Sequence, residues 1–262
     1  MIARRKSGFL LKNLSMKKLL ILATTFLMSF TDAFAARCIA HRGYFADVSE
    51  NSIGSIEAAL AVGADGVEFD VRHTSDGIPI LLHDETFDRV ISDDSTQCRT
   101  GVPVFQMTWA EISENCRLKD GQRFSRLGEA LHVFRGTDHL AFVEVKDKPT
   151  DLFVESIKSS QLDFDQIRFI SFKTKYLRKL RRKFKEIKSL RLSRFIPFFQ
   201  FRRGMNVDEP LRIYTFFSRI FGQESGVWTI NDTEALELNH QKKIDFITTD
   251  EIELCLAAKR IN

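Results

Sequence analysis

Four ionisable side chains stand inside segments that otherwise have the apolar composition of buried strands. Glu68 and Asp70 alternate with apolar residues between positions 66 and 71. A strand has a side-chain period of two, so both carboxylates lie on one face, about 7 Å apart. Glu144 and Lys146 have the same spacing at the end of the segment 140–146. Strands of a parallel sheet are normally apolar on both faces, so these charges need a reason.

Two histidines directly follow apolar segments of the same kind. His41 comes after Ile39-Ala40, and His83 comes after Leu81-Leu82. We expect both histidines, like the four charged residues, to lie toward the C-terminal ends of strands, where α/β barrels carry their active sites.

The charged residues have two interpretations. They can form structural ion pairs, for example Glu144 with Lys146 or Asp70 with Arg72, because ion-pair networks also fill barrels. However, three carboxylates and one lysine leave an excess of negative charge. A bound divalent cation offsets that repulsion, and ligands that are all oxygen favour Mg²⁺ or Ca²⁺.

The elements that position these residues alternate between short apolar runs and longer amphipathic ones. Eight strands are predicted, at 38–40, 66–71, 78–82, 140–145, 167–171, 190–195, 227–230 and 244–248. Helical patterns lie between them at 52–62, 127–134, 151–159, 176–187 and 209–221. Eight strand-helix units in about 227 residues predict a single closed (β/α)8 TIM barrel, and no second domain is evident.

One connection is far longer than the barrel needs. Residues 85–124 separate the third predicted strand from its helix, where roughly 2 to 6 residues usually suffice. We interpret this segment as a functional insertion.

The first thirty-five residues resemble a secretory signal peptide. A basic stretch precedes the apolar run 19–30, which is shorter than the roughly 20 residues of a membrane span, and Ala33-Phe34-Ala35 supplies a small-x-small cleavage site. The true start is Met1 or Met16. Cleavage leaves residues 36–262 as the barrel, exported to the periplasm or secreted, with 33 basic and 34 acidic residues. The formal net charge of +4 is therefore no argument for nucleic-acid binding.

All four cysteines lie after the predicted cleavage site, and an oxidising compartment permits disulfides. Cys98 and Cys116 lie in the same insertion, and we expect them to form a bridge. Cys38 and Cys255 become neighbours if a barrel closes, but a strand cysteine is often a core residue, so we expect this pair to be unbridged.

Charge is unevenly distributed along the chain. Residues 173–203 contain thirteen Lys/Arg and one acidic residue, Glu186. Five apolar residues at helical spacing, from Tyr176 to Ile187, predict a helix with one buried and one cationic face. This cationic face is either an ordinary solvated surface, with the aromatics at 195–199 in the barrel, or a peripheral contact with an anionic membrane.

The ordered motifs resemble the glycerophosphodiester phosphodiesterase family over essentially the whole predicted mature chain. They are His41-Arg42-Gly43, Glu50-Asn51, Gly63-Ala64-Asp65-Gly66-Val67-Glu68-Phe69-Asp70-Val71, Asp76-Gly77, His83-Asp84-Glu85-Thr86, Glu144-x-Lys146, Ser171-Phe172, Trp228-Thr229-Ile230-Asn231 and Ile247-Thr248-Thr249-Asp250. Ser52 stands where Thr is usual, and the insertion matches poorly.

This resemblance implies a site and a reaction. The family's site would place a divalent cation (Mg²⁺ or Ca²⁺) on Glu68, Asp70 and Glu144, with His41 and His83 as the acid/base pair. Arg42 and Lys146 would lie near the phosphate, and Trp228 would shape the substrate pocket.

The implied reaction is metal-dependent hydrolysis of glycerophosphodiesters to glycerol 3-phosphate and an alcohol. Two histidines can divide its proton transfers, although the sequence leaves open which is acid and which is base. The alternatives are a phospholipase D-like enzyme acting on lysophospholipids or sphingomyelin, and a catalytically inactive exported binding protein. The polar insertion favours a water-soluble substrate, and the presence of both histidines disfavours the binding protein.

Overall fold

The computed structural model describes residues 35–194, 204–208, 215, 220–242 and 244–261, and Ala35–Asn262 form one compact unit. The predicted signal peptide, the aromatics at 195–199 and most of the predicted helix at 209–221 lie outside the described residues.

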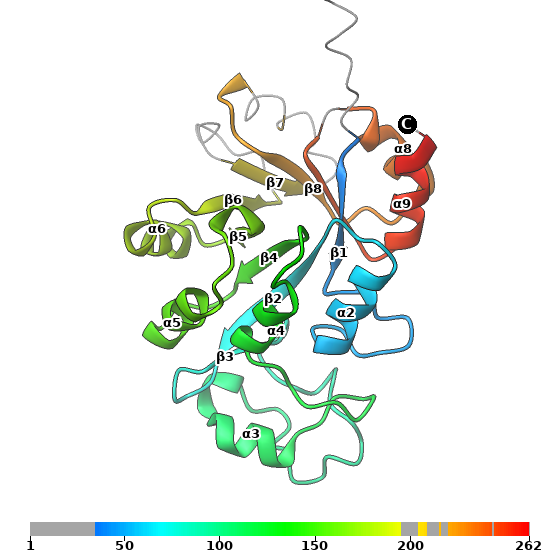
Figure 1. Ribbon diagram of the computed structural model, residues 1–262. Helices are drawn as coiled ribbons and strands as arrows, with labels where there is room; N and C mark the ends of the chain where they lie inside the picture. The colour runs from blue at the N-terminus through cyan, green and yellow to red at the C-terminus, as the bar shows by residue number, and fades with distance from the viewer. Residues whose placement is uncertain (1–34, 195–203, 209–214, 216–219, 243, 262) are drawn as a thin grey trace, which may run out of the picture. The chain divides into compact units, whose positions relative to one another are not determined.

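Eight parallel strands form a closed barrel (Figure 1). In ring order they are β1, β9, β8, β7, β6, β5, β4 and β2, and β2 pairs again with β1. Their bounds are β1 Arg37–His41, β2 Gly66–His73, β4 Leu140–Val145, β5 Ile167–Ser171, β6 Lys188–Ser193, β7 Gly204–Asp208, β8 Ser225–Trp228 and β9 Phe246–Thr249. The predicted fold is therefore confirmed.

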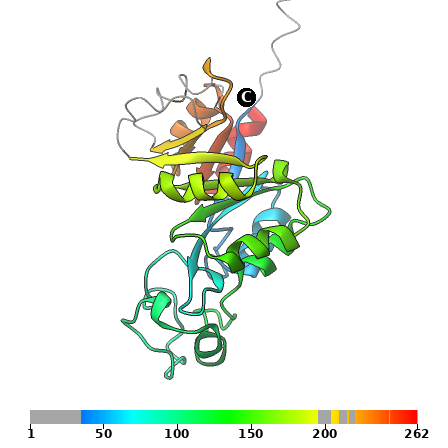
Figure 2. The same cartoon turned by 90° about the vertical axis from the view of Figure 1, so that its left-hand side faces the viewer.

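Helices cover the outside of the ring, as the two views show (Figures 1 and 2). They are α2 Ile53–Ala61, α4 Leu127–Val133, α5 Asp151–Ser159, α6 Thr174–Lys183, α8 Thr233–His240 and α9 Ile252–Ile261, with the short η2 Phe164–Gln166 before β5. Side-chain caps fix several helix starts: Ser52 accepts from the backbone N–H of Ser55, and Thr150 from that of Phe153.

Two strand predictions need correction. The apolar segment 78–82 is not a barrel strand, because β3 (Pro79–Leu81) pairs antiparallel with the end of β2 and lies outside the ring. Pro79 cannot donate a ladder hydrogen bond, which suits it to an edge position. The eighth barrel strand is β7, whose sequence Gly-Met-Asn-Val-Asp contains three residue types that favour turns and so gave no strand signal.

The barrel has separate inner and outer cores. The outer core lies between the strands and the helices, whereas the interior is filled by seven buried residues, Ile39, Leu140, Phe142, Ile170, Leu190, Leu192 and Phe246. Near the N-terminal ends of the strands, the buried Arg168 donates to both carboxylate oxygens of Glu224, each at 2.7 Å, and lies over the ring of Phe246. Arg168 and Glu224 thus close the barrel interior at the N-terminal ends of the strands, and the polar groups of the predicted site lie at the C-terminal ends.

The insertion between β3 and α4 has a small core of its own. It contains η1 (Val104–Gln106) and α3 (Trp109–Asn115), which pack around Phe87, Ile112 and Phe124. A disulfide joins Cys98 to Cys116, with 4.9 Å between their Cα atoms.

A second disulfide joins Cys38 to Cys255, which the sequence led us to expect as unbridged core residues. Cys38 is on β1 and Cys255 is on α9, and both are fully buried. Because the ring closes between β9 and β1, the last helix packs against the first strand and brings the two Cα atoms to 6.0 Å.

Helix α6 has the two faces that its sequence predicts, although it ends at Lys183 rather than at 187. Leu177 and Leu180 are buried, and Arg178, Arg182 and Lys183 are exposed. In the described part of the chain, no helix is both long enough and apolar enough to cross a membrane.

The two disulfides predict that unreduced, denatured protein has no titratable thiol. Replacing Cys98 and Cys116 by Ser should lower the free energy of unfolding by about 3 kcal/mol. Replacing Cys38 and Cys255 should lower it by about 2–5 kcal/mol, because that bridge closes a much longer loop. Denaturant titration of both double variants measures the two losses, and four free thiols in the parent protein would contradict both bridges.

The second interpretation of the cationic face of α6, a peripheral membrane contact, predicts binding to anionic membranes, to which each exposed cation contributes about 1 kcal/mol. Residues 36–262 should then cosediment with phosphatidylglycerol vesicles at low salt but not with phosphatidylcholine vesicles. The triple variant Arg178→Ala, Arg182→Ala, Lys183→Ala should lose this binding. Equal sedimentation of the triple variant and the parent would show that α6 is only a solvated surface.

Candidate active site

Three carboxylates from two neighbouring strands lie together inside the mouth of the barrel. Asp70 of β2 pairs in register with Glu144 of β4, and Glu68 is one pleat earlier on β2. All three are buried, with exposed fractions of 2% for Glu68, 1% for Asp70 and 8% for Glu144. One oxygen from each lies within 4.8 Å of the others.

Two cations from the same edge of the barrel partly offset this charge. The Nζ of Lys146 lies 3.0 Å from Asp70 Oδ1 and 3.1 Å from Glu144 Oε1. The guanidinium of Arg42 lies 3.4 Å from Asp70 Oδ2, and its backbone N–H donates to Glu68 at 3.2 Å. Both cations thus contact Asp70, whereas Glu68 accepts from the backbone N–H of Arg42.

The pKa values of the three carboxyl groups diverge accordingly. Burial, together with the neighbouring Asp70 and Glu144, raises the pKa of Glu68 well above its usual range. Burial and the charge of Asp70 raise the pKa of Glu144 to about 7. Burial also opposes ionisation of Asp70, but Lys146 and Arg42 outweigh it and lower the pKa of that group.

This carboxylate cluster fits a hard divalent cation. Its donors are all oxygens, and the buried Oε1 of Glu68 has no hydrogen-bond partner. An unsatisfied buried carboxylate oxygen is costly. A bound cation would satisfy it and would offset both the burial and the repulsion that raise the pKa values of Glu68 and Glu144.

His41 is oriented by a carboxylate. Its Nδ1 lies 2.7 Å from Asp250 Oδ1, and its Nε2 points toward Glu68, with 4.0 Å to Oε2. Asn231 donates to the other oxygen of Asp250 at 2.7 Å. Asp250 thus fixes the ring so that Nε2 faces the carboxylate cluster.

His83 has an equivalent arrangement. Its Nδ1 lies 2.7 Å from Asp84 Oδ1, and Arg89 of the insertion donates to Asp84 Oδ2 at 2.6 Å. Burial lowers the pKa of His83, although the nearby Asp70 opposes the shift.

The expectation that His83 ends a barrel strand is wrong. The β2–β3 hairpin turns back at Thr74–Ile78, and the backbone N–H of Leu82 donates to Asp70 O at 3.0 Å. This antiparallel return brings His83 beside Asp70.

The segment Glu50-Asn51 does more than begin a helix. Ser52 is the N-cap of α2, whereas Asn51 donates to Asp70 Oδ2 at 3.0 Å and accepts from the Asp70 backbone at 2.9 Å. Glu50 accepts from Arg42 at 3.0 Å and from Arg89 through two bonds of 2.6 and 2.8 Å. A helix-cap pattern involves only residues that are close in sequence, whereas Asp70 and Arg89 are remote from Glu50 and Asn51. The sequence pattern therefore could not predict these contacts.

The backbone after β1 is unusual where it meets the site. Arg42 and Asn51 have positive φ values of 59° and 54°, and Gly43 has 88°. A Cβ at Gly43 would also collide with the backbone of Ser55. Glycine at position 43 therefore permits the close turn that directs the Arg42 N–H to Glu68.

The structure thus brings together seven of the eight residues assigned to the reaction. His41, His83, Glu68, Asp70, Glu144, Arg42 and Lys146 form one site. Trp228 belongs to a neighbouring group at the end of β8, where it contacts Phe172 and Arg194.

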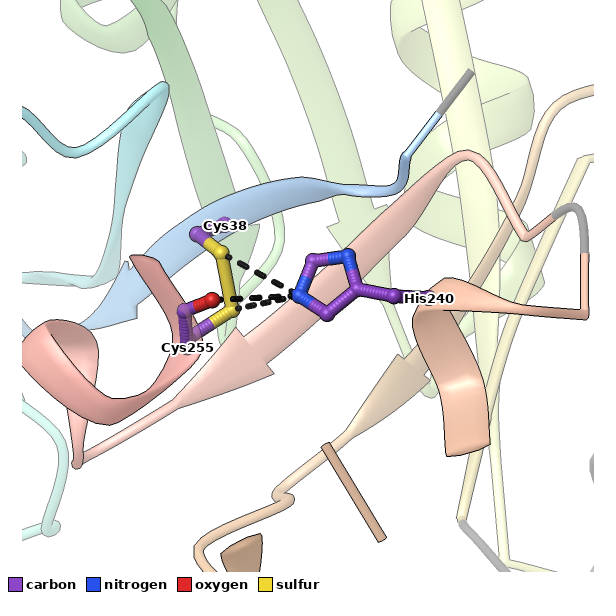
Figure 3. Close-up of side chains that lie close together, drawn as sticks. All are labelled: Cys38, His240 and Cys255. Atoms are coloured by element: carbon purple, nitrogen blue, oxygen red, sulfur yellow. Dashed lines mark hydrogen bonds between the residues drawn. A yellow bond between two sulfur atoms is a disulfide. The ribbon is translucent and has the colours of Figure 1, made fainter. Parts of the chain in front are cut away.

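A second cluster of ligand-type atoms lies outside the barrel interior (Figure 3). The Nε2 of His240 is 3.8 Å from the sulfur of Cys38 and 3.6 Å from that of Cys255. Because the two sulfurs are bonded to each other, the cluster offers no thiolate to a metal, and we interpret it as a buried, packed disulfide.

Comparison with known proteins identifies related sequences. The profile of the "Glycerophosphoryl diester phosphodiesterase family" matches residues 41–194. Rat "Glycerophosphodiester phosphodiesterase 1" is 33% identical over 132 residues, which are 49% of this chain and 39% of the rat protein. A "Glycerophosphodiester phosphodiesterase" from Caldanaerobacter subterraneus subsp. tengcongensis is 34% identical over 114 residues, 41% of this chain and 44% of that protein. The matches thus span less than half the length of these curated relatives.

Solved structures extend the likeness to most of the chain. The glycerophosphodiester phosphodiesterase of Thermotoga maritima superposes with a TM-score of 0.66 at 27% identity, covering 85% of this chain and 97% of that one. A phosphodiesterase of Oleispira antarctica, solved in complex with sn-glycerol-3-phosphate, gives a TM-score of 0.72 at 24% identity, covering 86% and 97%. The second likeness shows a shared fold.

The raised pKa values predict pH-dependent binding of a divalent cation. The pKa of Glu144 is about 7 and that of Glu68 is also raised, so a cation must displace protons, and affinity for Mg²⁺ or Ca²⁺ should rise with pH through about 7. Calorimetry in two buffers of different ionisation enthalpy should detect proton release. Glu68→Gln should abolish binding, and Glu57→Gln, on the surface of α2, should not. Cation affinity that is constant from pH 5.5 to 8 would contradict this site.

Proposed function

Because the chain belongs to the glycerophosphoryl diester phosphodiesterase family, we propose that it hydrolyses glycerophosphodiesters to glycerol 3-phosphate and an alcohol. The related rat protein carries the name of that activity, and the Oleispira antarctica phosphodiesterase was solved with the glycerol phosphate product. Both observations support the proposal.

The observation that carries the proposal is the pair of histidine-carboxylate contacts beside one carboxylate cluster. His41 is held by Asp250 and His83 by Asp84, in both cases through Nδ1 at 2.7 Å. Each Nε2 is then available to transfer a proton. Phosphodiester hydrolysis needs two such groups, because the nucleophile must lose a proton and the leaving alkoxide must gain one.

The remaining residues would bind the cation and offset negative charge on the phosphate. Glu68, Asp70 and Glu144 would hold a divalent cation, which when bound supplies Lewis-acid stabilisation of phosphoryl oxygens. Arg42 and Lys146 would lie beside the phosphate and offset the negative charge that develops in the transition state. Glu50, by accepting from Arg42 and Arg89, would hold the first of these cations in place.

We also propose that the protein acts outside the cytoplasm. The signal-like segment 1–35 supports this, and two disulfides suit an oxidising compartment. Its substrates would then be the water-soluble diesters found in the periplasm or the surroundings of the cell.

The proposal predicts the effect of removing either imidazole. His41→Ala and His83→Ala should each reduce kcat by at least about 10²-fold, because a proton transfer is lost. The measurement is release of glycerol 3-phosphate from glycerophosphodiesters by the purified protein, with Mg²⁺ or Ca²⁺ and with excess chelator. Chelation should abolish the rate.

The matched control is His132→Ala, an exposed histidine on α4, which should keep the parent rate. A His41→Ala or His83→Ala variant with a near-normal rate would remove that histidine from the mechanism. Products other than glycerol 3-phosphate, or activity on lysolipids alone, would contradict the proposed reaction.

A further inference from the structure

Three side chains beyond the carboxylate cluster form a compact group at the mouth of the barrel. Phe172 follows β5, Arg194 follows β6 and Trp228 ends β8. The rings of Phe172 and Trp228 meet edge to face, with centroids 5.4 Å apart and an interplanar angle of 81°. The guanidinium carbon of Arg194 lies 5.5 Å from the Phe172 centroid and 5.3 Å from that of Trp228.

The strand register places this group on the inner side of the barrel. Ile170 pairs with Glu144, so Phe172, two residues further along, faces the same interior as Lys146. Leu192 belongs to the interior core, and Arg194 follows it by two residues. Trp228 packs against that core, and its indole N–H donates to Asn206 O at 3.2 Å. The group therefore borders the site on the side of Lys146.

Solvent reaches this group. Phe172 is 37% exposed, and Arg194 is exposed. Because Phe172 faces the same interior as Lys146, a substrate whose phosphate lies at Arg42 and Lys146 would direct one of its organic substituents toward the two rings and the guanidinium.

The positive charge of Arg194 decides what this group can bind. Two aromatic faces without a cation are the type of site that takes up a quaternary ammonium. Here the guanidinium already lies over both rings, so an incoming trimethylammonium group would meet a like charge and would have to displace it. The N–H groups of a guanidinium instead suit hydroxyl and anionic oxygens.

Resting on the proposed function, we propose that Arg194, positioned by Phe172 and Trp228, selects the leaving alcohol. The preferred diesters carry an uncharged or anionic, hydroxyl-rich alcohol, and those with a cationic alcohol such as choline are disfavoured. Arg194 is thus a specificity-determining residue outside the proton-transfer pair and the carboxylate cluster.

The test compares kcat/KM for glycerophosphoglycerol and glycerophosphocholine. The parent protein should favour the glycerol diester by about tenfold or more, and Arg194→Ala should bring the ratio near one, chiefly by improving the choline diester. Arg194→Lys, which keeps the charge, should retain part of the preference. Arg260→Ala removes an equal charge from the exposed side of α9 and controls for long-range electrostatics, so its ratio should equal that of the parent.

Each result has a separate meaning. If Arg194 were only a packing residue, its removal would lower both kcat/KM values equally and leave the ratio unchanged, which would overturn the inference. A parent protein that prefers the choline diester would also overturn it while leaving the proposed function intact. A folded, cation-loaded parent protein that hydrolyses neither diester would overturn the proposed function, and the inference with it.

Discussion

The repulsion among three buried carboxylates is the constraint to which the rest of the site responds. Glu68, Asp70 and Glu144 are placed together by the register of β2 and β4, which is fixed by apolar packing on the outer faces of the same strands. Lys146 and Arg42 stabilise Asp70 and leave Glu68 without an ionic partner of comparable strength. The mouth of the barrel therefore carries an excess of buried negative charge, which a bound divalent cation would offset.

A chain of ion pairs extends outward from the carboxylate cluster. Asp70 contacts Arg42, Arg42 contacts Glu50, and Glu50 contacts Arg89 of the insertion. Arg89 in turn holds Asp84, the partner of His83. The insertion is thus a structural support of the site. Its own core and its disulfide keep Arg89 in place.

Whether the sequence predicts a structural feature depends on how far apart in the sequence the interacting residues lie. The barrel follows from the alternation of strand and helix patterns, and the shared face of Glu68 and Asp70 follows from the side-chain period of a strand; both signals are local. The antiparallel β3 and the strand β7 could not be distinguished in this way, because an apolar run does not show its pairing partner and Gly-Met-Asn-Val-Asp shows no strand preference. Asp250, Asp84 and Asn51 belong to sequence motifs that resemble the family. Their contacts with His41, His83 and Asp70 form only when the tertiary structure brings these residues together.

The two disulfides differ in when they can form during synthesis. Cys98 and Cys116 are separated by 18 residues, so that bridge can oxidise while most of the barrel is still being made. Cys38 and Cys255 are separated by 217 residues, and Cys38 is in the first strand of the ring while Cys255 is in its last helix. The native bridge between Cys38 and Cys255 therefore cannot form until the final segment has emerged, and its presence shows that the ring has closed.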